Sequence, residues 1–297
     1  MEFANLLCER RDGVLVVTLN RPQKLNSFSL GLLKDLRSCA EAIQRERGLR
    51  AVLLTGAGRG FCAGADLTDP EGFPAPGQSM GQLMGSRLRE YYNVVAMLWC
   101  SLPVPLVVGL NGVAAGAGAS LALMGDITIA AKSAHLTFVF APKLGLVPDM
   151  GGTYFLARRI GEARARAFAL TGQPIGAEEA ARIGLIAECV EDAQFESRTN
   201  EIVAALAAGP RDAFLGVRAL NGLAAAIARA RREARPVLWG LGGHVVKVGL
   251  APVLLDLMER GFATGFVLNG AAAIHDAEIA LVGATSEDVA AGIFGGA

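Results

Sequence analysis

The sequence predicts a layered α/β fold, and three observations support this. Short runs rich in β-branched residues alternate with stretches whose apolar residues recur at helical spacing. Of the 297 residues, 52% are hydrophobic and only 6% are aromatic, which favours a tightly packed α/β protein rich in Ala, Val and Leu. The 37 glycines supply turns between the elements. A chain of this length can form one large domain and an accessory piece.

The first half of the chain predicts strands and helices in a regular order. The predicted strands are residues 14–20, 50–55, 104–110 and 126–131, and the predicted helices are residues 29–47, 86–100 and 116–124. Residues 69–78 are polar and rich in proline and glycine, so we expect a loop there. Alternation of this kind is typical of a sheet covered by helices.

Residues 91–125 contain no charged side chain and are long enough to span a bilayer. Pro103 and Pro105 interrupt this stretch, and several glycines follow them. Two short buried elements joined by a glycine-rich turn therefore fit better than one membrane helix.

The second half of the chain predicts more helix and then changes character. Helices are expected at residues 177–183, 196–208 and 211–232. After residue 235, we expect a small βαβα unit with strands at 237–240 and 261–268 and helices at 250–260 and 271–281. The predicted organisation is a catalytic core at 1–190, a helical region at 191–234 and an atypical α/β tail at 235–297.

The charge balance excludes bulk electrostatic attraction to nucleic acid or to an anionic membrane. Lys and Arg together number 28, and so do Asp and Glu. The five cysteines lack CxxC spacing, which argues against a zinc site and favours reduced thiols. The first residues lack the hydrophobic region of a signal peptide, so we expect a cytoplasmic protein.

Two glycine-rich segments follow apolar strands, at residues 60–67 (GFCAGADL) and 111–119 (NGVAAGAGA). Small side chains allow a ligand to approach the backbone closely. Two backbone N–H groups that converge on one carbonyl oxygen form an oxyanion hole. Either segment alone would be interpreted as a tight turn, but the two together favour a site.

Further motifs occur along the chain in a fixed order. They are residues 20–27 (NRPQKLNS), 145–153 (GLVPDMGGT), 170–175 (LTGQPI), 177–180 (AEEA) and 184–186 (GLI). Together with the two glycine-rich segments, they resemble the enoyl-CoA hydratase/isomerase (crotonase) superfamily over about residues 2–218. The resemblance implies a crotonase-like spiral of ββα repeats with C-terminal helices. It also implies an acyl-CoA substrate, no cofactor beyond the coenzyme A of that substrate, no metal, and a homotrimer or dimer of trimers.

The resemblance also implies a set of site residues. The backbone N–H groups of Ala65 and Ala117 would be the oxyanion donors, although the family usually has glycine at the second position. Lys24 would lie on the coenzyme A path, with a solvated turn lysine as an equal alternative. The residues implied to contact the acyl-CoA are Lys24, Leu25, Ala63, Ala65, Asp66, Leu67, Gly116 and Ser120.

The reaction depends on the acid and base residues. Hydratases of the family use two glutamates, and this chain has Ser120 at the first position and Phe140 or Ala141 at the second. Asp149 remains, at a position where family isomerases carry an aspartate that moves a proton between carbon atoms. The resemblance therefore favours double-bond isomerisation of an enoyl-CoA thioester, with Asp149 as the proton shuttle.

Several alternatives stay open at this point. In the dehalogenase branch of the family, an aspartate at the position of Asp149 is a nucleophile, and Asp149 could also simply cap the next helix. Ser120 could hold a water molecule or a substrate hydroxyl, although a buried helix serine is the simpler interpretation. The chain could be a hydratase with atypical acid and base residues, or a non-catalytic acyl-CoA-binding protein.

Two further regions carry predictions, one about the acyl pocket and one about the C-terminal tail. We expect the loop at 69–78 and the helix at 86–100 to shape the acyl pocket, with Tyr91, Tyr92 and Trp99 as selecting residues. Parts of residues 235–290 resemble one fragment of deoxyhypusine synthase-like proteins. That fragment is too small to form a site, so a packing or oligomerisation module is the preferred interpretation.

Overall fold

The computed structural model describes residues 2–72, 74–210, 214, 226–241 and 251–268. The chain divides into two units, Met1–Leu215 and Gly216–Ala297, and each is described by itself.

The main sheet of the first unit has six strands in the order β1-β2-β3-β5-β7-β10. All neighbours are parallel except β1 and β2. Alternate residues point to opposite faces of a strand, so Leu15 and Val17 enter one core and Val14 and Val16 enter another. The strands are β1 (Leu6–Arg11), β2 (Val14–Leu19), β3 (Ala51–Gly56), β5 (Leu106–Leu110), β7 (Ile127–Ala131) and β10 (Glu188–Val190).

A second sheet of four short strands has the order β4-β6-β8-β9. These are β4 (Gly60–Cys62), β6 (Val113–Ala115), β8 (His135–Thr137) and β9 (Ile175–Gly176). Each of β3, β5 and β7 in the main sheet is followed along the chain by a strand of the second sheet and then by a helix. The result is a repeated ββα unit, as the family resemblance implied.

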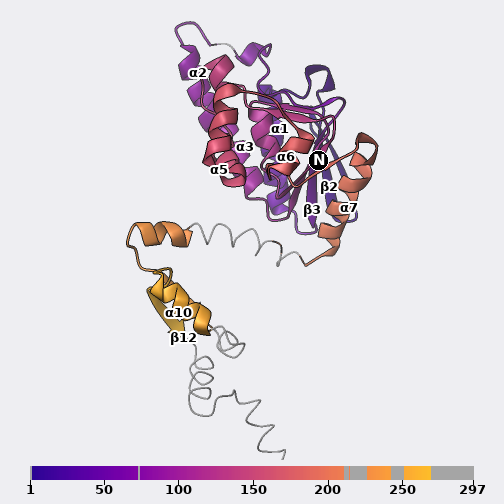
Figure 1. The fold of residues 1–297 in the computed structure, drawn as a ribbon. Helices are drawn as coiled ribbons and strands as arrows, with labels where there is room; N and C mark the ends of the chain where they lie inside the picture. The colour runs from indigo at the N-terminus through magenta and orange to yellow at the C-terminus, as the bar shows by residue number, and fades with distance from the viewer. Residues whose placement is uncertain (1, 73, 211–213, 215–225, 242–250, 269–297) are drawn as a thin grey trace, which may run out of the picture. The chain divides into compact units, whose positions relative to one another are not determined.

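Helices cover both faces of the main sheet (Figure 1). α1 (Leu30–Arg45), α3 (Asn93–Cys100), α4 (Ala117–Ala122) and α5 (Gly152–Thr171) contribute to the larger core. α7 (Phe195–Ala208) covers the other face, where its Val203 packs in a core with residues of β2, β3, β5 and β7. α6 (Ala177–Arg182) carries Glu178 and Glu179 in its first turn, where the helix dipole favours acidic residues.

The apolar spacing of α1 shows how the sequence builds this core. Ser29 caps the helix by accepting a hydrogen bond from the backbone N–H of Leu32 at 3.2 Å. The residues that recur at helical spacing in the sequence are all buried: Leu32, Leu33, Leu36, Ala40 and Ile43.

Some elements differ from the sequence prediction. The single helix expected at residues 86–100 is α2 (Met80–Arg87), a five-residue π-helix η3 (Leu88–Tyr92) and α3. The loop at 69–78 contains a 3-10 turn, η2 (Pro70–Gly72). Other short helical turns are η1 (Pro22–Lys24), η4 (Phe140–Leu144) and η5 (Asp192–Gln194). The uncharged stretch at 91–125 forms short elements, of which β5 and α4 are buried, whereas α3 leaves Met97 70% exposed. None of the helices in the described residues has the length and apolarity needed to cross a membrane.

In the second unit, residues 226–232 are helical. β11 (Leu238–Leu241) and β12 (Gly265–Leu268) pair in parallel, and α10 (Ala251–Glu259) connects them along the chain. The indole N–H of Trp239 donates to the carbonyl of Phe262 at 3.1 Å. The helix expected at 271–281 and much of the one expected at 211–232 lie outside the described residues.

Candidate active site

The carboxyl ends of three parallel strands of the second sheet meet at one edge. β4 pairs with β6, and β6 pairs with β8. The backbone N–H of Gly116, just after β6, donates to the carbonyl of Thr137 at the end of β8 at 2.9 Å. The two glycine-rich segments and the chain that leads to Asp149 therefore begin at the same edge.

Gly64 shows how closely the two glycine-rich segments pack. Its φ is +88°, and a Cβ at this position would lie 2.7 Å from the carbonyl oxygen of Ala115 and 3.7 Å from the backbone nitrogen of Ala117. A side chain there would be strained and would collide with the second segment. Glycine at position 64 thus allows Ala65 to lie beside the start of α4.

The N–H group of Ala65 is left free by the local backbone pairing. Ala65 forms an isolated parallel bridge with Phe28, in which Phe28 donates to Gly64 and Asp66 donates to Phe28, at 2.7 and 2.9 Å. In such a bridge, the N–H of the central residue points away from its partner strand. Ala117 is the first residue of α4, where the N–H has no acceptor within the helix. Across the described turns and loops, neither N–H donates a backbone hydrogen bond.

Asp149 lies between η4 and α5, with a buried carboxylate oxygen. Within the described residues, its Oδ1 atom has no hydrogen-bond partner. Burial raises the pKa of Asp149 to about 6, while its own backbone N–H lowers it slightly. The N-cap of α5 is Gly151, with no side-chain capping bond, so Asp149 is not the cap of that helix.

Ser120 lies one turn after Ala117 in α4 and is completely buried. Its Oγ also has no partner among the described groups. A Cβ on Gly152 would lie 2.6 Å from this oxygen, and the N–H of Gly152 donates to the carbonyl of Asp149 at 2.8 Å. The Ser120 hydroxyl and the backbone carbonyl of Asp149 therefore both lie beside Gly152.

Arg159 of α5 holds that helix against the end of α4. It donates to the carbonyls of Leu123 and Gly125 at 2.7 and 2.8 Å, and to the carbonyl of Leu185 at 2.9 Å. Burial lowers the pKa of the guanidinium, although its three carbonyl partners keep it well satisfied. This anchor fixes the start of α5, and with it Asp149, relative to Ser120.

A cavity of about 430 Å³ opens beside Ala65. Tyr92 lies in its wall, edge-on to Phe28 with ring centroids 5.9 Å apart. Burial raises the pKa of Tyr92, and the charge of nearby Asp149 raises it further. The apolar wall residues are Phe28, Leu30, Leu33, Met80, Leu83, Met84, Leu144 and Leu146.

The expected roles of the other two aromatic residues differ from what the structure shows. Trp99 is fully buried in the core, where its indole N–H donates to the carbonyl of Leu36 at 3.1 Å, so it does not reach the cavity. Tyr91 is not part of the cavity wall, and its ring lies 5.6 Å from the guanidinium carbon of Arg87.

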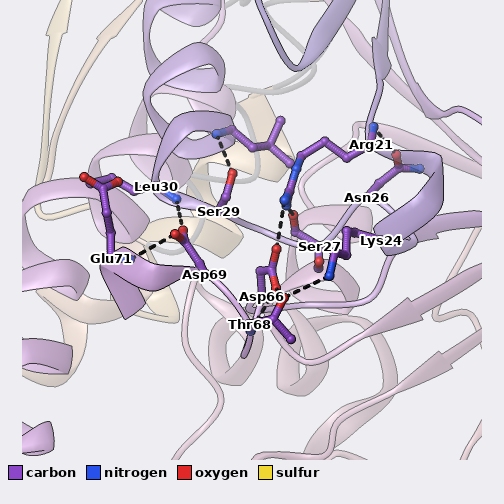
Figure 2. A network of polar contacts seen from close by, with 11 residues as sticks. Arg21, Lys24, Asn26, Ser27, Ser29, Leu30, Asp66, Thr68, Asp69 and Glu71 are labelled. Atoms are coloured by element: carbon purple, nitrogen blue, oxygen red, sulfur yellow. Dashed lines mark hydrogen bonds and ion pairs between the residues drawn. The ribbon is translucent and has the colours of Figure 1, made fainter. Parts of the chain in front are cut away.

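A polar network surrounds Asp66, and Figure 2 shows Arg21, Lys24 and Thr68 gathered there. Arg21 forms an ion pair with Asp66 at 2.8 Å, and the Asp66 side chain is only 5% exposed. The backbone N–H and hydroxyl of Thr68 also donate to Asp66, at 3.0 and 2.7 Å. Burial by itself would raise the pKa of Asp66, but the hydrogen bonds from Thr68 and Arg21 bring it below its usual value.

The remaining predicted residues lie around this network. Lys24 is exposed and donates to the hydroxyl of Thr68 at 3.0 Å. Leu25 has a φ of 49° and accepts a hydrogen bond from the N–H of Ala63 at 3.0 Å. Leu67 is 74% exposed. The predicted binding residues thus form a rim beside Ala65.

Sequence reasoning missed Arg21 and Thr68 as site residues. Arg21 lies in the NRPQKLNS motif, but its partner is 45 residues away, and only the fold brings the two together. The signal available was Asp66 itself, because a buried carboxylate needs a cation or several donors. Phe140, at one of the two positions expected for a second glutamate, is buried and apolar. No group of three or more His, Cys, Asp or Glu side chains in the described part of the chain could hold a metal ion.

Comparisons with known proteins show what the chain is similar to. The sequence profile of the family described as enoyl-CoA hydratase/isomerase matches residues 9–234. The chain is 44% identical to 1,2-epoxyphenylacetyl-CoA isomerase of Escherichia coli K12 over 214 residues, 71% of this chain and 78% of that protein. It is 42% identical to a probable enoyl-CoA hydratase of Rhodobacter capsulatus over 219 residues, 73% of this chain and 81% of that protein.

A solved structure agrees with the fold. The crystal structure of a putative enoyl-CoA hydratase from Streptomyces coelicolor A3(2) superposes with a TM-score of 0.69 at 33% identity, over 87% of this chain and 93% of that one. The prediction of a crotonase-like α/β fold is therefore confirmed. The resemblance of residues 235–290 to deoxyhypusine synthase-like proteins finds no support in these comparisons.

Proposed function

Because the chain belongs to the enoyl-CoA hydratase/isomerase family, we propose that it isomerises an enoyl-CoA thioester with Asp149 as the proton shuttle. The observation that carries this proposal is the Asp149 carboxylate, which has a buried, unpartnered oxygen and a pKa raised to about 6. Such a carboxylate is ionised at neutral pH and is a stronger base than an ordinary aspartate.

The reaction needs two parts of the site. The thioester oxygen would accept hydrogen bonds from the N–H groups of Ala65 and Ala117, each worth about 3 kcal/mol in such sites. Asp149 would remove a proton from C2 of a 3-enoyl thioester, leaving a dienolate whose negative charge lies on that oxygen. Asp149 would then return the proton to C4, so that the double bond moves to C2–C3 and the atoms balance.

The two remaining features fit the two ends of the substrate. We assign the rim that includes Lys24 and Asp66 to coenzyme A, and the apolar cavity beside Ala65 to the acyl group. A phenyl ring fits in a cavity of about 150 Å³, whereas this cavity measures about 430 Å³. We therefore expect acyl groups larger than one phenyl ring, such as medium-length aliphatic chains, to fill it best.

Two other functions remain as competing candidates. Water addition is the second candidate, because the hydroxyl of Ser120 and a carboxylate oxygen of Asp149 are both buried without a partner among the described residues, and together they could hold a water molecule. A non-catalytic acyl-CoA-binding protein is the third, and the raised pKa of Asp149 argues against it.

A panel of 2-enoyl, 3-enoyl and ring-bearing CoA thioesters separates these functions by the mass of the product. Isomerisation leaves the mass unchanged and moves the double bond, hydration adds one water, and a binding protein gives no product. Asp149→Asn should lower kcat by about 10²–10⁴-fold while thioester binding persists. Asp192→Asn, an exposed aspartate on η5, is the matched control and should leave kcat unchanged. Wild-type rates in Asp149→Asn with every active substrate would refute the role of Asp149.

A further inference from the structure

Tyr92 is a buried polar residue of the cavity wall that the proposed proton transfer does not use. Tyr92 is only 5% exposed, and its hydroxyl forms no hydrogen bond with the described residues. Its ring packs edge-on against Phe28, which restricts the orientation of the phenol. Buried hydroxyl groups nearly always have a partner, and an exception needs an explanation, such as a ligand.

A π-turn places Tyr92 in the cavity wall. α2, η3 and α3 follow one another without a gap, and the residues at both junctions, Leu88 and Asn93, have α-helical backbone angles. The wall side chains of α2 recur at i, i+3, i+4 and i+7, and continued α-helical spacing would bring Tyr91 to this face. The extra residue of the π-turn moves the position by one, so Tyr92 lies in the wall and Tyr91 does not. The wall side chains of α2 are Met80, Leu83, Met84 and Arg87.

The other polar side chains of the wall are exposed or already hydrogen-bonded to the protein. Asp66 is held by the ion pair and the hydrogen bonds described above. Asp69 accepts from two backbone N–H groups, at 2.8 and 3.1 Å (Figure 2). Arg87 donates to the carbonyl of Glu71 at 2.8 Å, and Glu71 is exposed. In the described part of the wall, Tyr92 is therefore the buried polar side chain left for a ligand.

The Tyr92 phenol stays protonated near neutral pH, so its hydroxyl can donate a hydrogen bond. Burial raises the pKa of Tyr92, and the charge of Asp149 raises it further, so the phenol lies within electrostatic range of the proposed base. An all-carbon acyl chain would displace water from this hydroxyl without replacing its hydrogen bond, which weakens binding. An oxygen on the chain would replace that bond. π-turns are also frequent at functional sites.

We propose that Tyr92 determines acyl specificity by donating a hydrogen bond to an oxygen on the acyl chain. The preferred substrates are then CoA thioesters whose medium-length, otherwise apolar chain carries an ether or carbonyl oxygen. The acyl group is the occupant of the cavity in the proposed function, and the role of Tyr92 rests on that assignment. Removal of the hydroxyl leaves Asp149 and the oxyanion donors in place.

Tyr92→Phe tests this role, because it removes the hydroxyl and keeps the ring that packs against Phe28. Tyr91→Phe is the matched control, since Tyr91 lies outside the wall. The probes are octanoyl-CoA and analogues in which an ether oxygen replaces one methylene group at successive positions of the chain. They are titrated into the full-length chain by calorimetry. These saturated thioesters cannot isomerise, so binding is measured without turnover.

For at least one position of the oxygen, Tyr92→Phe should weaken binding by on the order of tenfold. Octanoyl-CoA should bind this variant at least as tightly as the wild type, and Tyr91→Phe should bind every probe as the wild type does. The urea midpoint of Tyr92→Phe should equal or exceed that of the wild type, because the hydroxyl has no partner among the described residues to lose.

Three results would overturn the role of Tyr92. They are unchanged affinity of Tyr92→Phe for every probe, an equal loss of affinity for octanoyl-CoA and all the ether analogues, and a lower urea midpoint. The first would mean that the hydroxyl contacts no acyl oxygen, and the other two that it supports packing. Failure of the proposed function looks different, because the wild type would then bind none of these thioesters.

Discussion

Two carboxylates, Asp66 beside Ala65 and Asp149 just before α5, have opposite surroundings. Asp66 has an ion pair with Arg21 and two hydrogen bonds from Thr68, and its pKa is lowered. Asp149 has a buried oxygen without a partner among the described residues, and its pKa is raised to about 6. The hydroxyl oxygen of Ser120 is likewise buried without a hydrogen-bond partner in the described part of the chain.

This difference indicates a structural role for Asp66 and a chemical role for Asp149. A carboxylate whose hydrogen-bonding capacity is filled by the protein holds the loop after β4 in place and has little basicity left to offer a substrate. A carboxylate that is buried without partners destabilises the folded protein, and that arrangement is characteristic of catalytic groups. The N–H groups of Ala65 and Ala117 also donate no backbone hydrogen bond in the described turns and loops, so they too are available to a substrate.

Among the further predictions, Ala117→Pro should have the largest effect, because it removes one of the free donors. Proline is tolerated at the first position of a helix, which Ala117 occupies in α4. We expect kcat to fall by about 10²–10³-fold, as when one oxyanion donor is removed elsewhere. Ala117→Gly keeps the N–H group and should retain kcat, so it is the control. Full activity in a folded Ala117→Pro protein would show that this donor is not used.

Arg21→Ala should mainly affect stability. It leaves the nearly buried Asp66 without its cation, so the free energy of unfolding should fall by about 3 kcal/mol. The matched control is Arg37→Ala, which breaks the exposed pair with Glu41 and should cost less than about 1 kcal/mol. Urea unfolding measures both changes. The structural role assigned to Asp66 would be wrong if Arg21→Ala lowered kcat at saturating substrate as strongly as Asp149→Asn does.

The sequence predicted the parts of the fold that depend on local pattern. The strands at residues 14–20 and 126–131 and the helix at 29–47 appear within two residues of their predicted ends. Their residues alternate or recur at helical spacing, so one core-facing side is visible in the sequence. The 20-residue helix α5 was not predicted, and Gly161 interrupts it with a φ of 77°. The π-helix η3 was also missed, because a helix with an extra residue in one turn keeps a helical composition.

The candidate site was predictable only as a set of segments. The two glycine-rich stretches and Asp149 stand out in the sequence, and the parallel pairing of β4, β6 and β8 brings them together. The partners of Asp66 and the absence of partners for Ser120 depend on side-chain placement across distant elements. No spacing rule in the sequence encodes that placement.

Asp149→Asn should change how stability depends on pH. The folded-state pKa of about 6 exceeds the ordinary value of 3.8, so ionising the buried carboxyl group destabilises the wild type. This penalty is absent below about pH 4, grows between pH 4 and 6, and reaches about 2–3 kcal/mol above pH 6. Relative to Asp149→Asn, the wild type should therefore lose that much unfolding free energy between pH 4 and 8. A constant difference across this range, measured by urea unfolding, would mean that Asp149 titrates normally.

The smallest predicted effect is the fall of the wild-type kcat/KM at acid pH. It links the basicity of Asp149 directly to the rate. Asp149 must be ionised to accept a proton, so kcat/KM should be constant above its pKa of about 6 and fall as the pH drops below it. At pH 5 the rate should be about tenfold below the plateau, since each pH unit protonates tenfold more of the base. A limb centred near pH 4 instead would place the base in a solvated environment like that of an ordinary aspartate. In that case the burial of Asp149 would be a feature of packing alone, and the distinction between the two carboxylates would lose its chemical meaning.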